Sequence, residues 1–455
     1  MSSNNITRQY GWYLFLLGLF SATQVRLLGS IGISEIVICL VAPFVFITDY
    51  HQLKWDGFLK ITWLSILVMA GCVIACITNG TPFTAAMRGF ATTYVMFSSI
   101  VVGHRLIRRC PMGIKWFYFG VAISVVINIF VFQTATELVI YGGGETGIDA
   151  AEGIMRSPIF WISRIQEWLF LPIRGWYLQT PMFYSVLAPL GFAIFAIFTS
   201  ISGRSAAATT LMMAFFALLG GRKVMHLKIL SKNSLVILIM SVLVMMGISS
   251  IYKRAATSGI LGESAYLKYE GQMKGRDSSS ILTLLMAGRS EFFVGAYACL
   301  QKPFIGYGPW AVDREGFYEH FVTQYGDAED IAAFEKNRKW QERVGYRRIG
   351  FIPAHSHVIS FWLWFGIFGL LFWLYVLFQY MRYFKKDLAT VPQWFGPLGI
   401  FAAPFLWNFF FSPLGARVPT GIFIVLIMMT RAVRWGRFIL PPEMVYEVER
   451  RTARE

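Results

Sequence analysis

Apolar runs of about twenty residues recur along nearly the whole chain, and this pattern constrains the fold more than any other feature. A helix of roughly 20 apolar residues is long enough to cross the hydrocarbon core of a bilayer. The 455 residues are 56% hydrophobic and 15% charged, whereas a soluble domain carries roughly a quarter charged residues. We therefore expect an all-α polytopic integral membrane protein. At roughly 30 to 40 residues per span and connection, it would have about 10–12 transmembrane helices.

Basic segments between the apolar runs set the orientation that we expect, because cytoplasmic loops of membrane proteins carry an excess of Lys and Arg. Four clusters are assigned to the cytoplasm with both termini: Arg105, Arg108, Arg109 and Lys115; Arg222, Lys223, Lys228 and Lys232; Arg382, Lys385 and Lys386; and the arginine-rich tail from Arg431. The candidate spans cover 11–28, 30–48, 58–77, 83–103, 115–135, 179–199, 204–220, 234–251, 356–380, 395–413 and 416–433.

This orientation places two long polar segments on the outer side of the membrane, and the longer one is expected to carry short amphipathic helices. One conflict remains. Three candidate spans lie between two clusters that should both be cytoplasmic, so either 179–199 re-enters without crossing or part of 156–175 crosses. The predicted organisation is an N-terminal transmembrane bundle (1–135), a first periplasmic loop (136–178), central transmembrane helices (179–251), a large periplasmic loop (252–355), C-terminal transmembrane helices (356–433) and a cytoplasmic tail (434–455).

The net charge of +16 is explained by membrane topology, because the basic residues cluster in the segments between apolar runs, as they do in cytoplasmic loops. We therefore expect the lipid bilayer and no nucleic acid as a partner. The five cysteines have no paired-ligand spacing with histidine, and the chain lacks the GxxxxGK[ST], GxGxxG and HExxH patterns. The sequence therefore predicts neither a metal ion nor a cofactor.

Ionisable residues inside or at the edge of spans are costly and tend to mark function. Arginines around one outer cavity would bind a pyrophosphate, since a guanidinium forks onto phosphate oxygens. A neutral histidine nearby can take a proton from a hydroxyl nucleophile. Taken singly, each of these residues has a plainer interpretation as a headgroup anchor or an interfacial residue. The candidates on the expected outer side are Arg174, Arg204, Arg289, His355 and His357.

Three further ionisable residues lie within or at the end of apolar runs: Arg88, Glu35 and Arg26. Arg88 is added to the candidates for substrate binding. The alternatives are snorkelling to the interface, an internal ion pair, or a transport path formed with Glu35 and Arg26.

Four segments resemble motifs of the O-antigen ligase and polymerase superfamily, in the same order and over roughly residues 170–380. They are RGWYLQTPMFYSVLAPLGF, SGRSAAATTL, GRSEFFVGAYACLQKPFIGYGPWAV and AHSHVISFWLWFGIFGLLFWL. In the last one, Gly366 follows His355 by eleven residues and Gly369 follows three later, which is similar to the spacing around the family histidine. Ser356 stands where the family usually has Asn.

The resemblance implies an inner-membrane glycosyltransferase of the GT-C type that works on the periplasmic face and takes glycan from an undecaprenyl-pyrophosphate carrier. It implies that Arg204 and Arg289, with Arg174, bind the donor pyrophosphate. It also implies that His355 helps to activate the acceptor hydroxyl. His357 is a second candidate for that base.

We therefore expect a metal-independent bacterial polymerase that joins carrier-linked repeat units into O-antigen, capsule or exopolysaccharide. A chain-length regulator and a flippase of the same pathway are further partners that this reading implies. An O-antigen ligase acting on lipid A core is the alternative of the same chemistry. A transporter or flippase is the alternative of a different class, and the absence of internal repeats speaks against it.

Overall fold

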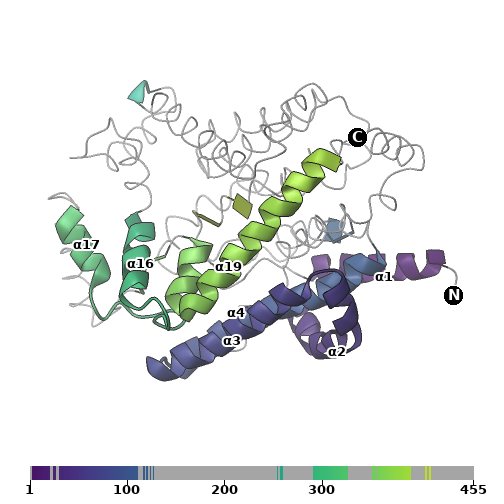
Figure 1. Cartoon of the computed structure of the whole chain (residues 1–455), viewed down its shortest axis with the longest axis horizontal. Helices are drawn as coiled ribbons and strands as arrows, with labels where there is room; N and C mark the ends of the chain where they lie inside the picture. The colour runs from purple at the N-terminus through teal and green to yellow at the C-terminus, as the bar shows by residue number, and fades with distance from the viewer. Residues whose placement is uncertain are drawn as a thin grey trace.

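Figure 1 shows the computed structural model of the chain, which describes residues 3–20, 24–26, 30–110, 290–325, 351–354 and 356–390 and a few short stretches elsewhere. The elements in these ranges are helical apart from one pair of short strands. In chain order they are α1 (Ser3–Leu19), β1 (Gln24–Arg26), β2 (Ser30–Gly32), α2 (Ile33–Trp55), α3 (Leu59–Thr78), α4 (Phe83–Arg109), α16 (Ser290–Gln301), α17 (Phe317–Tyr325) and α19 (His357–Thr390).

Four of the described helices are long and apolar enough to cross a membrane: Ile33–Trp55, Leu59–Thr78, Phe83–Arg109 and His357–Arg382. Ile33–Trp55, Leu59–Thr78 and Phe83–Arg109 are continuous helices of at least the roughly 20 residues that a bilayer requires, whereas His357–Arg382 is interrupted at Gly366. This confirms the prediction of a mostly α-helical, multi-pass membrane protein. The total of about 10–12 spans stays a prediction from length and composition.

The chain between α1 and α2 differs from the expected continuous span over 11–28. α1 ends at Leu19, and Arg26 lies in β1, where it pairs with Ser30 of the antiparallel strand β2. Glu35 then caps the start of α2, because its buried carboxylate accepts a hydrogen bond from the backbone N–H of Gly32 at 2.7 Å. A local structural role thus accounts for the buried carboxyl group of Glu35.

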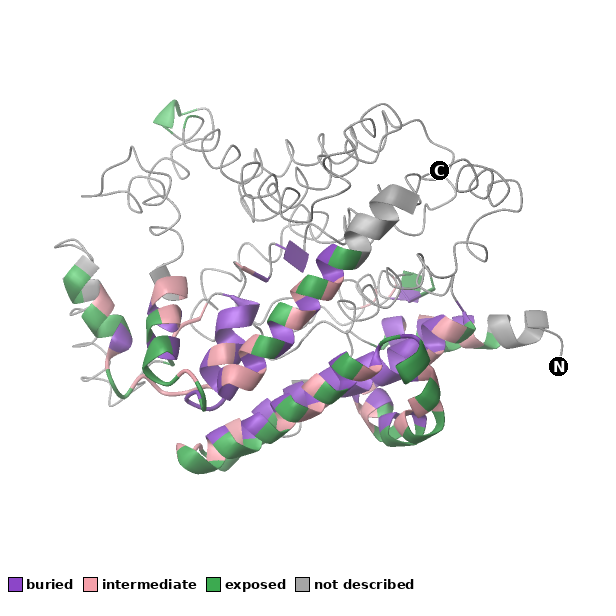
Figure 2. Ribbon diagram, in the orientation of Figure 1, coloured by how far each residue is buried: buried purple, intermediate pink, exposed green. Residues whose placement is uncertain are grey.

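The helices α2, α3 and α4 pack into one bundle, with α4 in contact with both of the others. Figure 2 shows α4 as largely buried, whereas much of α2 is exposed. The exposed side chains are apolar and large, with exposed fractions of 73% for Phe44, 75% for Ile47 and 76% for Ile77. A surface of this kind suits contact with lipid tails.

Basic residues gather at one end of this bundle. His104 Nε2, in the last turns of α4, lies 2.8 Å from Asp56 Oδ2 in the turn between α2 and α3. Arg105 Nη1 donates to Thr48 Oγ1 at 2.9 Å. The end of α4, with Arg108 and Arg109, therefore lies at the same end of the bundle as the α2–α3 turn, whose neighbourhood contains Lys54 and Lys60.

The helix α19 is a hairpin of two helical arms rather than one straight span. Its backbone is non-helical at Gly366, with φ 62° and ψ −145°. The rings of His357 and Trp373 lie only 5.3 Å apart, whereas 16 residues of continuous helix would separate them by about 24 Å. The Phe361 ring likewise lies 5.5 Å from that of Trp373. The short first arm therefore folds back along the long second arm, as Figure 1 shows.

The second arm of α19 runs antiparallel to α3. Phe368 packs where Gly71 leaves room in α3, and Tyr375 lines one hollow with Leu64 and Leu67, nearer the start of α3. Arg382, further along the second arm, thus lies toward the same end of the bundle as the start of α3 and the end of α4. Two basic clusters that the sequence assigned to one side of the membrane therefore lie at the same end.

Candidate functional site

Two of the six candidate site residues lie in the described part of the chain. They are Arg88, in α4, and His357, the first residue of α19. Arg174, Arg204, Arg289 and His355 lie outside the described residues. The site is therefore built from the segments that flank Arg289 and His355 in sequence, namely α16 and the first arm of α19.

His357 is a packed residue inside the α19 hairpin. Only 4% of it is exposed, and its ring lies against that of Trp373. The neighbouring Ser356 fixes the start of the helix, because its buried hydroxyl donates to the carbonyl of Phe409 at 2.8 Å. The sequence placed His357 where a polar loop meets a span, whereas the structure places it level with Trp373, inside the apolar span.

The imidazole of His357 has unused hydrogen-bonding capacity. Its Nδ1 atom is buried and has no hydrogen-bond partner among the described residues. A buried polar atom without a partner is unfavourable by about 1 to 3 kcal/mol and is uncommon in native proteins. Nδ1 of His357 can therefore still donate or accept a hydrogen bond, and no contact among the described residues uses it.

The loop 302–310, directly after α16, completes the backbone hydrogen bonding at the break in α19. The N–H groups of Tyr307 and Gly308 donate to the carbonyls of Leu363 and Trp364 at 2.6 and 3.2 Å. In return, the N–H of Ile367 donates to the carbonyl of Phe304 at 3.1 Å. A helix broken within a membrane is tolerated when protein groups satisfy its backbone in this way.

Glycines make this close approach of loop and helix possible. Gly306, Gly308 and Gly366 all have positive φ, which disfavours other residues. A Cβ on Gly366 would collide with the carbonyl oxygen of Phe304, and one on Gly306 would lie 2.7 Å from the carbonyl oxygen of Leu363. The GxG pair in the loop and the first glycine of the GxxG segment in α19 therefore form one backbone junction.

The same loop also contacts α3 and α4 at the end opposite to their basic residues. The Nδ2 of Asn79 donates to the carbonyls of Ala75 and Gly306, at 2.8 and 3.1 Å. Pro309 packs so closely on Gly89 that α4 has no room there for a Cβ. Sequence reasoning missed Asn79, since an Asn at the end of an apolar run has the ordinary interpretation of a helix cap.

Arg88 lies at this end of α4, next to Gly89, and it is exposed. It is therefore near the loop 302–310, whereas His357 is buried within α19. No described contact assigns Arg88 to a shared cavity with His357. Its role in substrate binding stays a prediction.

α16 lies alongside the first arm of α19 and runs in the same direction. Gly295 faces Pro353 and Ala354 so closely that a Cβ would lie 2.8 Å from the Pro353 carbonyl oxygen. Further along, the Cys299 thiol donates to the carbonyl of Ile359 at 3.7 Å. Burial raises the pKa of Cys299, which suits a packing role rather than a nucleophile.

This parallel packing brings together the two motif segments with which the resemblance was made. α16 begins directly after Arg289, and the first arm of α19 begins two residues after His355. Both helices run toward the junction formed by the loop 302–310 and Gly366. Their starting ends, where the arginine and the histidine adjoin them in sequence, therefore lie toward the same side.

A charged cluster follows the junction on the surface. Lys302 Nζ lies 3.2 Å from Glu315 Oε1 and 4.3 Å from the centre of the Tyr307 ring. The Tyr307 hydroxyl donates to Glu315 Oε2 at 3.3 Å. Burial raises the pKa of Tyr307, and the neighbouring Glu315 carboxylate raises it further. Tyr307 is thus held as a neutral hydrogen-bond donor.

Within the described ranges, no group of three or more His, Cys, Asp or Glu side chains could hold a metal ion. No protein-family model and no curated protein sequence matches this chain. The similarity to the O-antigen ligase and polymerase superfamily therefore rests on the quoted motifs alone.

Proposed function

We propose that this protein is a metal-independent membrane glycosyltransferase that polymerises carrier-linked glycan repeat units on the periplasmic face of a bacterial inner membrane. The donor would be a growing glycan on undecaprenyl pyrophosphate, and the acceptor a second carrier-linked repeat unit. The product would be an O-antigen, a capsule or an exopolysaccharide.

The parallel packing of α16 and the first arm of α19 carries this proposal. Gly295 against Pro353 brings the segment after Arg289 alongside the segment before His357. A glycosyl transfer from a lipid pyrophosphate needs a cation for the departing phosphates and a base for the acceptor. One motif segment supplies the arginine and the other supplies the histidines.

In the proposed reaction, the acceptor hydroxyl oxygen bonds to the anomeric carbon as the bond from that carbon to the pyrophosphate oxygen breaks. The electron pair of the broken bond leaves with undecaprenyl pyrophosphate, and arginine guanidinium groups neutralise its charge. The hydroxyl proton passes to a histidine. The sequence has no clearly placed carboxylate nucleophile, so we expect a single displacement that inverts the anomeric centre.

We assign the proton acceptor to His355 and a positioning role to His357. A general base must come within hydrogen-bond reach of its substrate. His357 is 4% exposed and packs on Trp373, so substrate has little access to it in this arrangement. The unpartnered Nδ1 keeps His357 as the alternative base, and the two roles are separable by mutation.

The test is a gel of surface polysaccharide from a deletion strain complemented with single variants. His355→Ala should abolish the long chains, since a general base contributes roughly 10² to 10⁴ in rate. His357→Phe keeps an aromatic ring beside Trp373 and should retain them. Arg289→Lys keeps the charge but loses the guanidinium fork, so it should shorten the chains. Arg109→Lys, at the basic end of α4, is the matched control and should be silent.

The form of the accumulated glycan separates polymerase from ligase. A polymerase deletion leaves single repeat units on lipid A core, whereas a ligase deletion leaves long chains on the carrier. Immunoblots of membranes establish that each variant is inserted. A normal ladder in the deletion strain would contradict the glycosyltransferase proposal and favour a transporter.

A further inference from the structure

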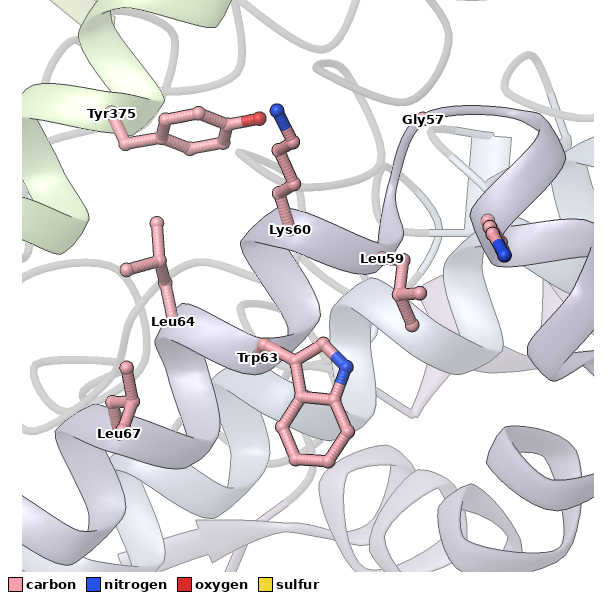
Figure 3. A pocket seen from close by; sticks show the side chains of 8 residues that line it. Gly57, Leu59, Lys60, Trp63, Leu64, Leu67 and Tyr375 are labelled. Carbon is pink, nitrogen blue, oxygen red and sulfur yellow. The ribbon is translucent and has the colours of Figure 1, made fainter.

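A hollow of about 570 Å³ lies between the first half of α3 and the second arm of α19. In Figure 3, the Lys60 ammonium and the Tyr375 hydroxyl extend toward one another, while Leu64 and Leu67 follow along α3. Its full lining is Lys54, Gly57, Leu59, Lys60, Trp63, Leu64, Leu67 and Tyr375.

The hollow has a cationic end and an apolar end. Lys54 and Lys60 are both exposed, and neither forms an ion pair with an acidic residue among those described. Beyond them, the wall includes Leu59, Leu64 and Leu67, and Leu67 is 43% exposed. Two unpaired ammonium groups above an apolar groove complement an anionic headgroup that carries a hydrocarbon chain.

The position of the hollow along the bundle agrees with that ligand. It lies at the end where Arg105, Arg108 and Arg109 close α4 and toward which Arg382 extends, and the excess of basic residues marks that end as cytoplasmic. Trp63, which is 46% exposed, is of a type enriched at membrane–water interfaces. The acidic lipids of a membrane attract basic residues near this surface.

We propose that this hollow binds one acidic phospholipid from the cytoplasmic leaflet. Its phosphate would lie between Lys54 and Lys60 and accept a hydrogen bond from the Tyr375 hydroxyl. One acyl chain would follow Leu64 and Leu67. The volume falls within the range of about 300 to 1,000 Å³ typical of small-molecule sites. The lining of the hollow shares no residue with the candidate glycosyltransferase site, and the proposal does not depend on that site.

Native mass spectrometry of the full-length protein in detergent tests the proposal. Phosphatidylglycerol and phosphatidylcholine with identical acyl chains are titrated separately. We expect the wild type to retain one phosphatidylglycerol at concentrations where phosphatidylcholine is lost. Each lysine near an anionic headgroup contributes about fivefold in affinity, so Lys54→Ala with Lys60→Ala should weaken retention about 25-fold. Arg109→Ala, which removes a charge at the same end but outside the hollow, is the matched control.

A second variant tests the apolar end and leaves the lysines in place. Leu67→Trp should fill the groove and reduce phosphatidylglycerol retention. The Leu67 side chain is 43% exposed, so the larger side chain should not prevent folding. Soluble glycerol phosphate should not compete, because it lacks the chain. Equal retention of the two lipids, or unchanged retention in both the double-lysine and the Leu67→Trp variants, would overturn the proposal. Displacement by glycerol phosphate would assign the site to a soluble anion instead.

Discussion

Gly366→Ala is the substitution that most directly tests the hairpin in α19. Gly366 has φ 62° and ψ −145°, and a Cβ there would collide with the carbonyl oxygen of Phe304. The change therefore strains the backbone and pushes the loop 302–310 away from the helix. Three backbone hydrogen bonds cross this junction, donated by Tyr307, Gly308 and Ile367.

The expected loss of stability follows from these two effects. A residue other than glycine in such a backbone region is unfavourable by about 1 to 3 kcal/mol. Each of the three lost hydrogen bonds adds about 0.5 to 1.5 kcal/mol, so the total is about 2.5 to 7.5 kcal/mol. At roughly 2 °C per kcal/mol for a chain of this size, the apparent Tm should fall by about 5 to 15 °C.

Gly80→Ala is the matched control for this experiment. Gly80 also has positive φ, at 58°, but a Cβ there would meet no atom within 4 Å. Only backbone strain of about 1 to 2 kcal/mol is expected, or about 2 to 4 °C. Fluorescence-detected size-exclusion chromatography of heated, detergent-solubilised protein measures both variants. Equal falls in Tm for the two would refute the close packing of loop and helix at Gly366.

Three further predictions concern the same region and its orientation. Asn79→Ala removes the amide that donates to Gly306 and should cost about 1 kcal/mol, seen as a drop of about 2 °C in the same assay. The raised pKa of Tyr307 means that its stabilising effect is complete below the unfolded pKa of about 10 and is lost as pH rises toward the folded value. Melting between about pH 9 and 11 should therefore depend less on pH in Tyr307→Phe than in wild type, and equal slopes would contradict this. In a cysteine-free background, Lys302→Cys should react with an impermeant maleimide added outside the cell, and Lys60→Cys only after permeabilisation. Labelling of both cysteines from the outside would contradict the placement of Lys302 and Lys60 on opposite sides of the membrane.

The all-α membrane class follows from the sequence. Unpaired backbone polar groups are unfavourable in lipid, so long apolar runs cross a bilayer as helices, in which every backbone group is paired. The same reasoning predicted the spans that became α2, α3 and α4, with boundaries that differ by up to seven residues. It also predicted that Arg105, Arg108 and Arg109 would lie on the same side as Arg382. Charge and hydropathy are properties of local sequence, so they can be recognised without knowing any neighbours.

The hairpin in α19 could not be predicted in the same way. The run 356–380 is largely apolar, and the glycines within it are equally compatible with a straight transmembrane helix. The reversal at Gly366 is stable because the loop 302–310, some sixty residues earlier in the chain, supplies the hydrogen bonds that the broken helix lacks. Hydropathy counts apolar residues and carries no information about such a partner.

For the candidate site, too, some features could be predicted from the sequence and others only from the structure. The sequence by itself determined the membrane class, the basic end and the chemistry that arginines and histidines could perform. Only the tertiary structure decided that His357 is packed against Trp373, that Asn79 holds the loop, and that α16 lies beside the first arm of α19. The physical reason is that these contacts join residues far apart in the chain, and their energies depend on geometry that no local pattern records.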